Sequence, residues 1–361
     1  MFSMIEQWYQ RKFSDPDALM LLIFILSISI ILVVWGGFLM PVLIAVVLAY
    51  LLDGIVTILT KKGASRTIST AVILFLFIGF TFTLTLSLLP TVSQQSINFI
   101  EEIPVFWQQI QSWLVTLPES YPELIQAEQI ENIMGDINLK LVGATEDIIS
   151  ISFASLVNIG ALLIYLILVP LMMFFMLKDK DALMSNIGNL LPTERRLIRQ
   201  VANEMNVQIA NYIRGKVIEI IIVGAVSCVA FVMMDLRYGI LLGVLVGLSV
   251  LIPYIGAAVV TIPVALVAFI QWGWSAEFGY LMLVYAIIQA LDGNLLVPLL
   301  FSEAVSLHPL YIIIAVLFFG GIWGFWGVFF AIPLATLVKA LIHAWTPEWR
   351  SKAEHSESSD V

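Results

Sequence analysis

The chain of 361 residues is strongly apolar and sparsely charged: 60% of its residues are hydrophobic, 12% are charged, and the formal net charge is −9. A soluble domain carries roughly twice that charged fraction, so a soluble globular protein is excluded. The mean hydropathy of +1.00 comes from continuous runs of Leu, Ile and Val, each long enough to cross ~30 Å of hydrocarbon as a helix. The composition predicts an all-α polytopic membrane protein, because a β-barrel would show short alternating segments instead.

Residue patterns typical of other functions are missing from the sequence. Cys228 is the single cysteine and lies in an apolar run, so an internal disulfide or a cysteine metal site is excluded. The sequence has no basic patch interleaved with aromatic residues, so nucleic-acid binding is not supported. The sequence contains no nucleophile elbow, metal-ligand set or phosphate-binding loop, so no motif in it indicates an enzyme, a metal site or a cofactor.

Residues 1–18 form a lead-in that is either an interfacial amphipathic helix or a frayed tail, and Arg11 and Lys12 assign it to the cytoplasm. Residues 19–90 hold three predicted transmembrane helices, and the third ends at Pro90. The first two form a hairpin that turns near Gly36 and Gly37, because basic residues at both ends indicate an even number of crossings.

Residues 91–150 are rich in acidic side chains and contain one basic residue, Lys140. Cytoplasmic loops are enriched in Lys and Arg, so this segment is predicted to lie outside. Apolar residues recur at near-helical spacing between Pro104, Pro118 and Pro122, which predicts short amphipathic extracytoplasmic helices on the membrane or against a neighbouring subunit. Their acidic face either attracts cations or is simply solvated.

Residues 151–177 form the predicted fourth transmembrane helix, which leads into a basic cytoplasmic loop at 178–216. Within this loop a helix is expected to begin at Thr193. A fifth span from 217 to 234 contains Glu219 near its cytoplasmic end. Glu219 either pairs with Arg214 or Lys216 at the interface or takes part in ion or proton coupling.

Residues 217–345 are predicted to form a C-terminal transport unit with a weak internal repeat, followed by a cytoplasmic tail at 346–361. The repeat consists of 238–271 and 308–343, which are either broken spans or re-entrant hairpins. Both alternatives place the C-terminus inside, and re-entrant backbone would require a cavity to satisfy its polar groups. The candidate hinge or broken-helix positions are Gly293, Pro298, Gly320, Gly321, Gly324 and Gly327.

A polar stretch from 289 to 309 interrupts this apolar unit. Gln289 and Asp292 are three residues apart and therefore share a helical face, and Asn294 follows them. A locally unwound helix here would offer carbonyls beside a carboxylate to a cation, a proton or a hydroxyl-rich solute; the alternative is that Asp292 marks the end of a short helix. The candidate substrate or ion path consists of Gln289, Asp292, Asn294, Pro253 and Gly256.

Several ordered motifs resemble the autoinducer-2 exporter (AI-2E) family of permeases. They are NYIRGK at 211–216, IPYIG at 252–256, the stretch from Gln289 through Asn294 to Pro298, and LHP at 307–309. RKFSDPD near the start and GGIWGFWGVFFAIPLATLVKALIHAW near the end extend the resemblance over nearly the whole chain.

The resemblance implies a multi-pass protein of the bacterial inner membrane, with about eight helices and both termini cytoplasmic. It also implies export of small solutes, with the signalling molecule autoinducer-2 in some members and sodium–proton exchange in others. A homo-oligomer, by resemblance a pentamer, is implied as well. We therefore expect a permease that exports or exchanges a small solute, proton or sodium by alternating access. The alternatives are a structural or regulatory envelope protein that acts through protein partners, and a passive channel.

Overall fold

A computed structural model describes residues 16–120, 134–135, 159–190, 196–301 and 307–344. All regular secondary structure in these residues is helical, which confirms the predicted fold class. Five helices are long and apolar enough to cross a membrane, and three shorter apolar helices accompany them. The predicted lead-in before Pro16, most of the acidic segment after Ser120, the predicted helix start at Thr193, and the C-terminal tail lie outside the described residues.

The N-terminal part consists of three long helices, α2 (Pro16–Lys61), α3 (Arg66–Ser120) and α5 (Ile159–Lys178), packed around buried apolar side chains such as Ala45 and Met173. The predicted hairpin turn near Gly36 and Gly37 is wrong, because α2 continues through both glycines. A glycine costs a helix only about 1 kcal/mol. Each unpaired backbone group in hydrocarbon costs several kcal/mol, so the unbroken helix is favoured.

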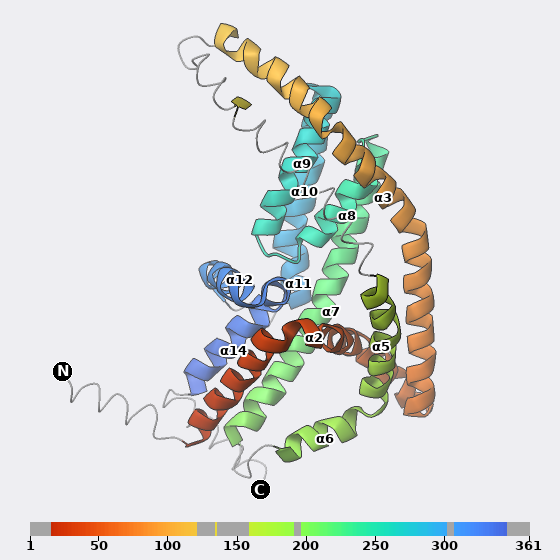
Figure 1. The fold of residues 1–361 in the computed structure, drawn as a ribbon, viewed down its shortest axis with the longest axis vertical. Coiled ribbons are helices and arrows are strands. Elements are labelled where there is room, and N and C mark those ends of the chain that lie inside the picture. The colour runs from red at the N-terminus through yellow and green to blue at the C-terminus, as the bar shows by residue number, and fades with distance from the viewer. Residues whose placement is uncertain (1–15, 121–133, 136–158, 191–195, 302–306, 345–361) are drawn as a thin grey trace, which may run out of the picture.

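Helix α3 is also longer than predicted, since it passes through Pro90, Pro104 and Pro118 without a break. Its 55 residues correspond to ~80 Å of helix, far more than the ~30 Å of hydrocarbon, so it extends beyond the membrane. The prolines are spaced by about four helical turns, so each bends the helix in the same direction. Figure 1 shows the resulting bow.

The predicted basic loop and fifth span differ from the structure in the same way. After α6 (Lys180–Leu190), one uninterrupted helix, α7 (Arg196–Met233), contains both the second half of the loop and the span. Buried positions such as Tyr212 and Ile213 explain this continuity, because they give the supposed loop an apolar face packed on the C-terminal helices.

Helices α7, α8 (Gly239–Ser249), α9 (Ile255–Trp272) and α10 (Ala276–Leu291) surround one apolar core. Helices α8 and α9 fold back on each other at residues 250–254, beside α7 and α10 (Figure 1). The 11 residues of α8 span only ~16 Å, about half of the hydrocarbon thickness. The first interrupted element is therefore a helical hairpin, in which a short helix turns back into a longer one.

Small residues join α8 to α7. Gly239, Gly243 and Gly247 recur every four residues along α8, as in membrane helices whose backbones approach closely. A Cβ on Gly243 would lie 2.6 Å from the Cα of Cys228, and one on Gly247 would lie 2.7 Å from the Cα of Gly224. Side chains at these positions would push the two helices apart.

The chain ends in short helices packed against α2 and α7: α11 (Val297–Phe301), α12 (Pro309–Trp323), α13 (Phe325–Phe329) and α14 (Ala331–Ala344). The second interruption lies at Gly324, which adopts a φ of 59° and ends α12. A Cβ on Gly327 would overlap the carbonyl oxygen of Phe319, and one on Gly256 would overlap that of Ser249. Both interrupted elements thus contain a close backbone approach that glycine permits.

Candidate functional site

The candidate site is built around a buried ion pair on α7. Lys216 Nζ lies 2.8 Å from Glu219 Oε2, and the two side chains are 5% and 2% exposed. The i,i+3 spacing places both on one helical face. Of the two interface partners considered for Glu219, the structure selects Lys216, and the pair is buried in the protein.

Asp292 brings a second carboxylate to this pair. It is 8% exposed, interacts electrostatically with Lys216 and Glu219, and its Oδ1 atom has no hydrogen-bond partner among the described residues. We call Lys216, Glu219 and Asp292 the buried charge cluster. Two carboxylates and one ammonium leave one excess negative charge when both acids are ionised, and a buried charge is costly without a partner.

A π-helical turn, η1 (Asp292–Leu296), places Asp292 in the cluster. The backbone N–H of Val297 donates to the carbonyl of Asp292, five residues earlier. Pro298 lacks an N–H, and its ring would clash with the carbonyl four residues earlier in an α-helix, so a wider turn is favoured here. Single π-turns inside helices are frequent at functional sites.

Aromatic side chains close the cluster on the α11 side. Lys216 Nζ lies 5.5 Å above the ring of Phe301, in cation–π range. A Cβ on Gly215 would come within 2.7 Å of that ring, so glycine makes room for it. The Tyr212 hydroxyl donates to the carbonyl of Phe329 at 2.7 Å and ties α7 to α13.

Gln289 belongs to a separate polar network that joins α10 to α9. Its Nε2 atom donates to the Tyr285 hydroxyl at 3.0 Å, and that hydroxyl lies 3.0 Å from Thr261 Oγ1. Tyr285 also donates weakly to the carbonyl of Ala257 at 3.4 Å. The network links the polar stretch to the first turns of α9, directly after the hairpin turn.

The hairpin turn itself is strained at Tyr254, which has a φ of 61° and a ψ of −48°. The N–H of Ile255 donates to the carbonyl of Pro253 at 2.7 Å, so Tyr254 is the centre of the rarer, strained kind of γ-turn. Tyr254 is exposed and Gly256 is buried against α8. Strain of this kind concentrates at functional and switch regions.

The remaining predicted site residues lie apart from the cluster. Asn294 is exposed and donates to the carbonyl of Ala290 at 2.8 Å, so its amide faces its own helix. Gly293 and Pro298 are exposed in or beside the π-turn, and Gly320, Gly321 and Gly324 lie near the end of α12. The pocket lined by Tyr50 and Asp53 contains no predicted path residue, and neither does the pocket lined by His308 and Tyr311.

Sequence reasoning did not place Lys216, Tyr285 or Thr261 in a site. Lys216 was assigned to the basic loop, because a lysine next to Arg214 is typical of a membrane interface. Tyr285 precedes Gln289 by one helical turn, and that spacing is a signal by which it could have been found. Thr261 carries no comparable signal, since its contact with α10 is tertiary.

Buried charges beside a π-turn and interrupted helices in an apolar bundle are features of membrane transporters. The sequence matches the family described as "AI-2E family transporter" over residues 19–347. The chain therefore belongs to the AI-2E transporter family, which confirms the resemblance seen in its motifs. It is a multi-pass membrane protein of a bacterial permease family.

Relatives from several bacteria cover most of the chain. It is 49% identical over 345 residues to the Escherichia coli K12 protein named "Putative permease PerM", with 96% of this chain and 98% of that protein covered. It is 28% identical to the Bacillus subtilis "Putative transport protein YueF", with 83% and 82% covered. A Thermotoga maritima "Putative transport protein" is 23% identical over 303 residues.

Proposed function

We propose that this protein is a secondary transporter that exports or exchanges a small solute or ion by alternating access, without catalysing a reaction. The buried charge cluster carries the proposal. Its excess negative charge is costly at low dielectric, and a bound proton or sodium ion would neutralise it. Intramembrane ionisable groups of this kind typically mark ion paths.

The position of Asp292 in the chain provides the coupling between cation binding and helix movement. It belongs to the π-turn between α10 and α11, whereas Lys216 and Glu219 belong to the continuous helix α7. A Cβ on Gly293 would meet no atom within 4 Å, so side-chain packing does not hold the π-turn on that side. When a cation neutralises the cluster, α10 and α9 move relative to the tightly packed pair of α7 and α8; when the cluster is charged, they stay in place.

The proposed setting is the bacterial inner membrane, with both termini cytoplasmic and a homo-oligomer as the working unit. The basic residues near the α2–α3 and α5–α6 connections support the orientation. Many apolar side chains on α3 are exposed in the single chain, including Phe75, Phe80 and Phe82, and either lipid or a second copy would cover them.

Proteoliposomes test the proposal. Vesicles with an entrapped pH dye receive an imposed sodium or pH gradient, and proton movement is recorded. Purified protein is expected to accelerate proton movement over empty vesicles, and Asp292→Asn and Glu219→Gln are expected to slow it about tenfold, equivalent to about 1.4 kcal/mol.

The matched control is Glu277→Gln, the same chemical change at an exposed position of α10. It is expected to transport at the wild-type rate. Wild-type rates in Asp292→Asn and Glu219→Gln would remove the cluster from the mechanism. Flux that does not saturate and does not depend on coupling to either gradient would indicate a passive channel instead.

A further inference from the structure

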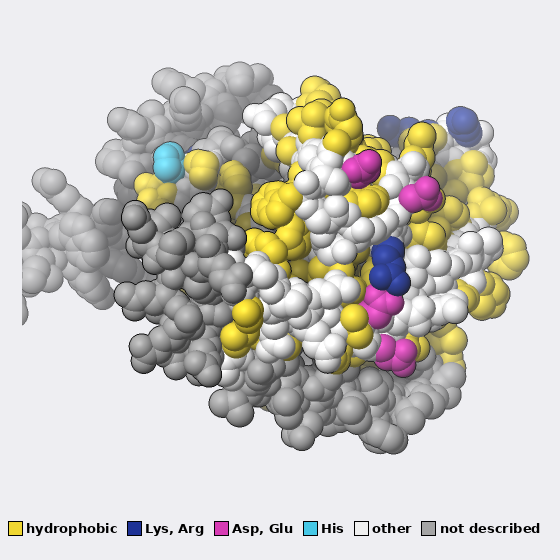
Figure 2. Space-filling model, turned by 90° about the horizontal axis from the view of Figure 1, so that it is seen from above, with side chains coloured by type: hydrophobic (Ala, Val, Ile, Leu, Met, Phe, Trp, Pro, Cys, Tyr) yellow, Lys and Arg dark blue, Asp and Glu magenta, His cyan; other side chains and the backbone are white. Residues whose placement is uncertain are grey.

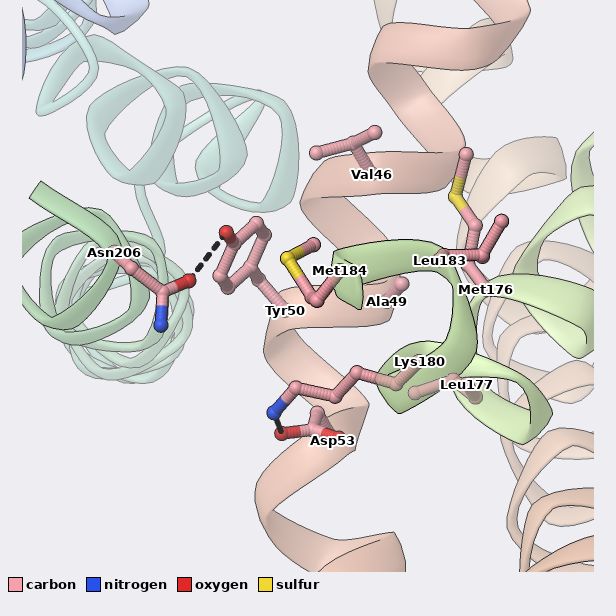
Figure 3. Close-up of a pocket in the computed structure, with 10 residues that line it drawn as sticks. All are labelled: Val46, Ala49, Tyr50, Asp53, Met176, Leu177, Lys180, Leu183, Met184 and Asn206. Atoms are coloured by element: carbon pink, nitrogen blue, oxygen red, sulfur yellow. Dashed lines mark hydrogen bonds and ion pairs between the residues drawn. The ribbon is translucent and has the colours of Figure 1, made fainter. Parts of the chain in front are cut away.

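A pocket of about 280 Å³ lies between α2, α5, α6 and α7, at the end of the molecule where α2 meets α3 (Figure 3). Most of its wall is apolar. The apolar lining consists of Val46, Ala49, Met176, Leu177, Leu183 and Met184. It is separate from the buried charge cluster, and no part of the proposed transport mechanism uses it.

One end of the pocket is charged. Lys180 Nζ lies 2.8 Å from Asp53 Oδ2, and the other oxygen of Asp53 lies 3.0 Å from Arg66 Nη2 (Figure 3 shows the lysine pair). Asp53 is therefore shared by two cations. An ammonium has three donors and Asp53 accepts one, while the Lys180 side chain is 37% exposed and open to a further anion.

Positive charge dominates this region. The α2–α3 and α5–α6 junctions carry five basic residues, Lys61, Lys62, Arg66, Lys178 and Lys180, against three acidic ones, Asp53, Asp179 and Asp181, which leaves a formal charge of +2. Arg66 Nε donates to the carbonyl of Leu177 at 2.7 Å, so the two junctions lie side by side. The pocket thus combines an apolar wall with cations at the ends of membrane helices.

We propose that this pocket binds one anionic phospholipid of the surrounding bilayer, with its phosphate at Lys180 and an acyl chain along the apolar wall. A soluble anion would use the cation but leave the wall uncovered. A zwitterionic lipid would cover the wall but bring no net charge to the cations. Basic pockets between membrane helices are known to select anionic headgroups. The bound lipid joins the α5–α6 corner to α2 and α7.

Native mass spectrometry of the full-length protein in detergent measures the binding. Phosphatidylglycerol and phosphatidylcholine with identical acyl chains are titrated separately. Phosphatidylglycerol is expected to bind more tightly, and Lys180→Gln is expected to weaken it about tenfold by removing a charge-assisted contact. The matched control, Lys61→Gln, changes an exposed lysine outside the pocket and is expected to bind normally.

Two pocket-filling variants test the acyl-chain half. Ala49→Phe and Leu183→Trp should each weaken phosphatidylglycerol binding, and the exposed position of Leu183 makes its variant easier to fold. Melting temperatures confirm that each variant is folded. Equal affinity for the two lipids, or wild-type affinity in Lys180→Gln, overturns the proposal. Glycerol 3-phosphate alone should not bind; if it binds with the same dependence on Lys180, the ligand is a small anion and the lipid proposal fails.

Discussion

Lys216 is the residue on which the buried charge cluster depends. Its ammonium pairs with Glu219 and interacts electrostatically with Asp292. Removing one partner of a buried pair leaves an uncompensated charge, whereas replacing both partners with apolar groups is often neutral. Removing one charge of the cluster is therefore expected to reduce stability. Because apolar residues could replace the whole pair at little cost, its presence favours a functional role.

Lys216→Met is expected to lower the free energy of unfolding by about 3–5 kcal/mol, because Glu219 loses its ion-pair partner in a buried site. The double variant Lys216→Met/Glu219→Met should recover part of that loss, because Glu219 is no longer left unpaired, while Asp292 still lacks its cation. Denaturant melts of purified protein in detergent measure both. Lys178→Met, at a largely solvent-accessible pair with Asp179, should change stability by less than about 1 kcal/mol. Equal losses in the single and double variants would contradict the assigned pairing.

At the scale of elements, the α8–α9 hairpin is fixed on one side and strained at its turn. Glycines hold α8 against α7, while Tyr254 adopts an unfavourable backbone conformation where α8 gives way to α9. Close helix packing resists sliding of α8, and the strained turn stores free energy next to it. This combination makes the turn the part of the hairpin that can change conformation at the lowest cost.

Gly243→Ala is expected to destabilise the protein by about 1–3 kcal/mol, because the added methyl overlaps the backbone of Cys228 and forces α7 and α8 apart. Gly279→Ala in α10 is the control, since its Cβ would meet no neighbouring atom and alanine favours the helix by up to about 1 kcal/mol. The melting temperatures of the two variants should shift in opposite directions from that of the wild-type protein. A loss of stability at Gly279 as large as that at Gly243 would contradict the close packing.

Tyr254→Gly is expected to be more stable than Tyr254→Ala by about 1 kcal/mol. Both variants remove the same exposed ring, but only glycine relieves strain of about 1–3 kcal/mol, partly offset by the larger entropy of its unfolded chain. Comparative denaturant melts provide the measurement. If alanine is the more stable of the two, Tyr254 is not held at positive φ.

At the scale of the whole molecule, the helices define two ends. Figure 1 places the α2–α3 connection and the α9–α10 connection at opposite ends of the molecule. The α2–α3 connection follows Lys61 and Lys62, whereas the α9–α10 connection contains the exposed Trp274 and no charged residue. Basic connections favour the cytoplasm, so the α2–α3 and α9–α10 connections are predicted to face opposite sides of the membrane.

Cysteine labelling tests this orientation. In a Cys228→Ala background, a membrane-impermeant maleimide should label Trp274→Cys in cells with a permeable outer envelope, and Lys62→Cys only after the inner membrane is opened. The positive-inside rule gives this direction. Labelling of both positions in unopened cells would place the two connections on the same side.

The site was only partly predictable from the chain. Asp292 and Glu219 stood out because carboxylates are rare in apolar runs, and the break at 250–254 followed from Pro253 and Gly256. Asn294 shared the polar stretch but faces its own helix, because the π-turn changes which side chains align. A turn predicted at Gly36 and a helix end predicted at Pro90 are both absent, because α2 and α3 continue through these positions. Breaking a helix in hydrocarbon costs more than keeping a glycine or proline inside it.

Long apolar runs and ordered motifs are local properties of the chain, so they already identify a helical membrane protein of the AI-2E family. The sequence also offered Lys216 as one of two possible partners of Glu219, and the continuous helix α7 places the two on one face. Tertiary packing brings Asp292 within electrostatic reach of this pair, folds α8 and α9 back on each other, and joins Arg66 to Lys180 through Asp53. Those contacts depend on the packing of distant helices, which no local pattern encodes.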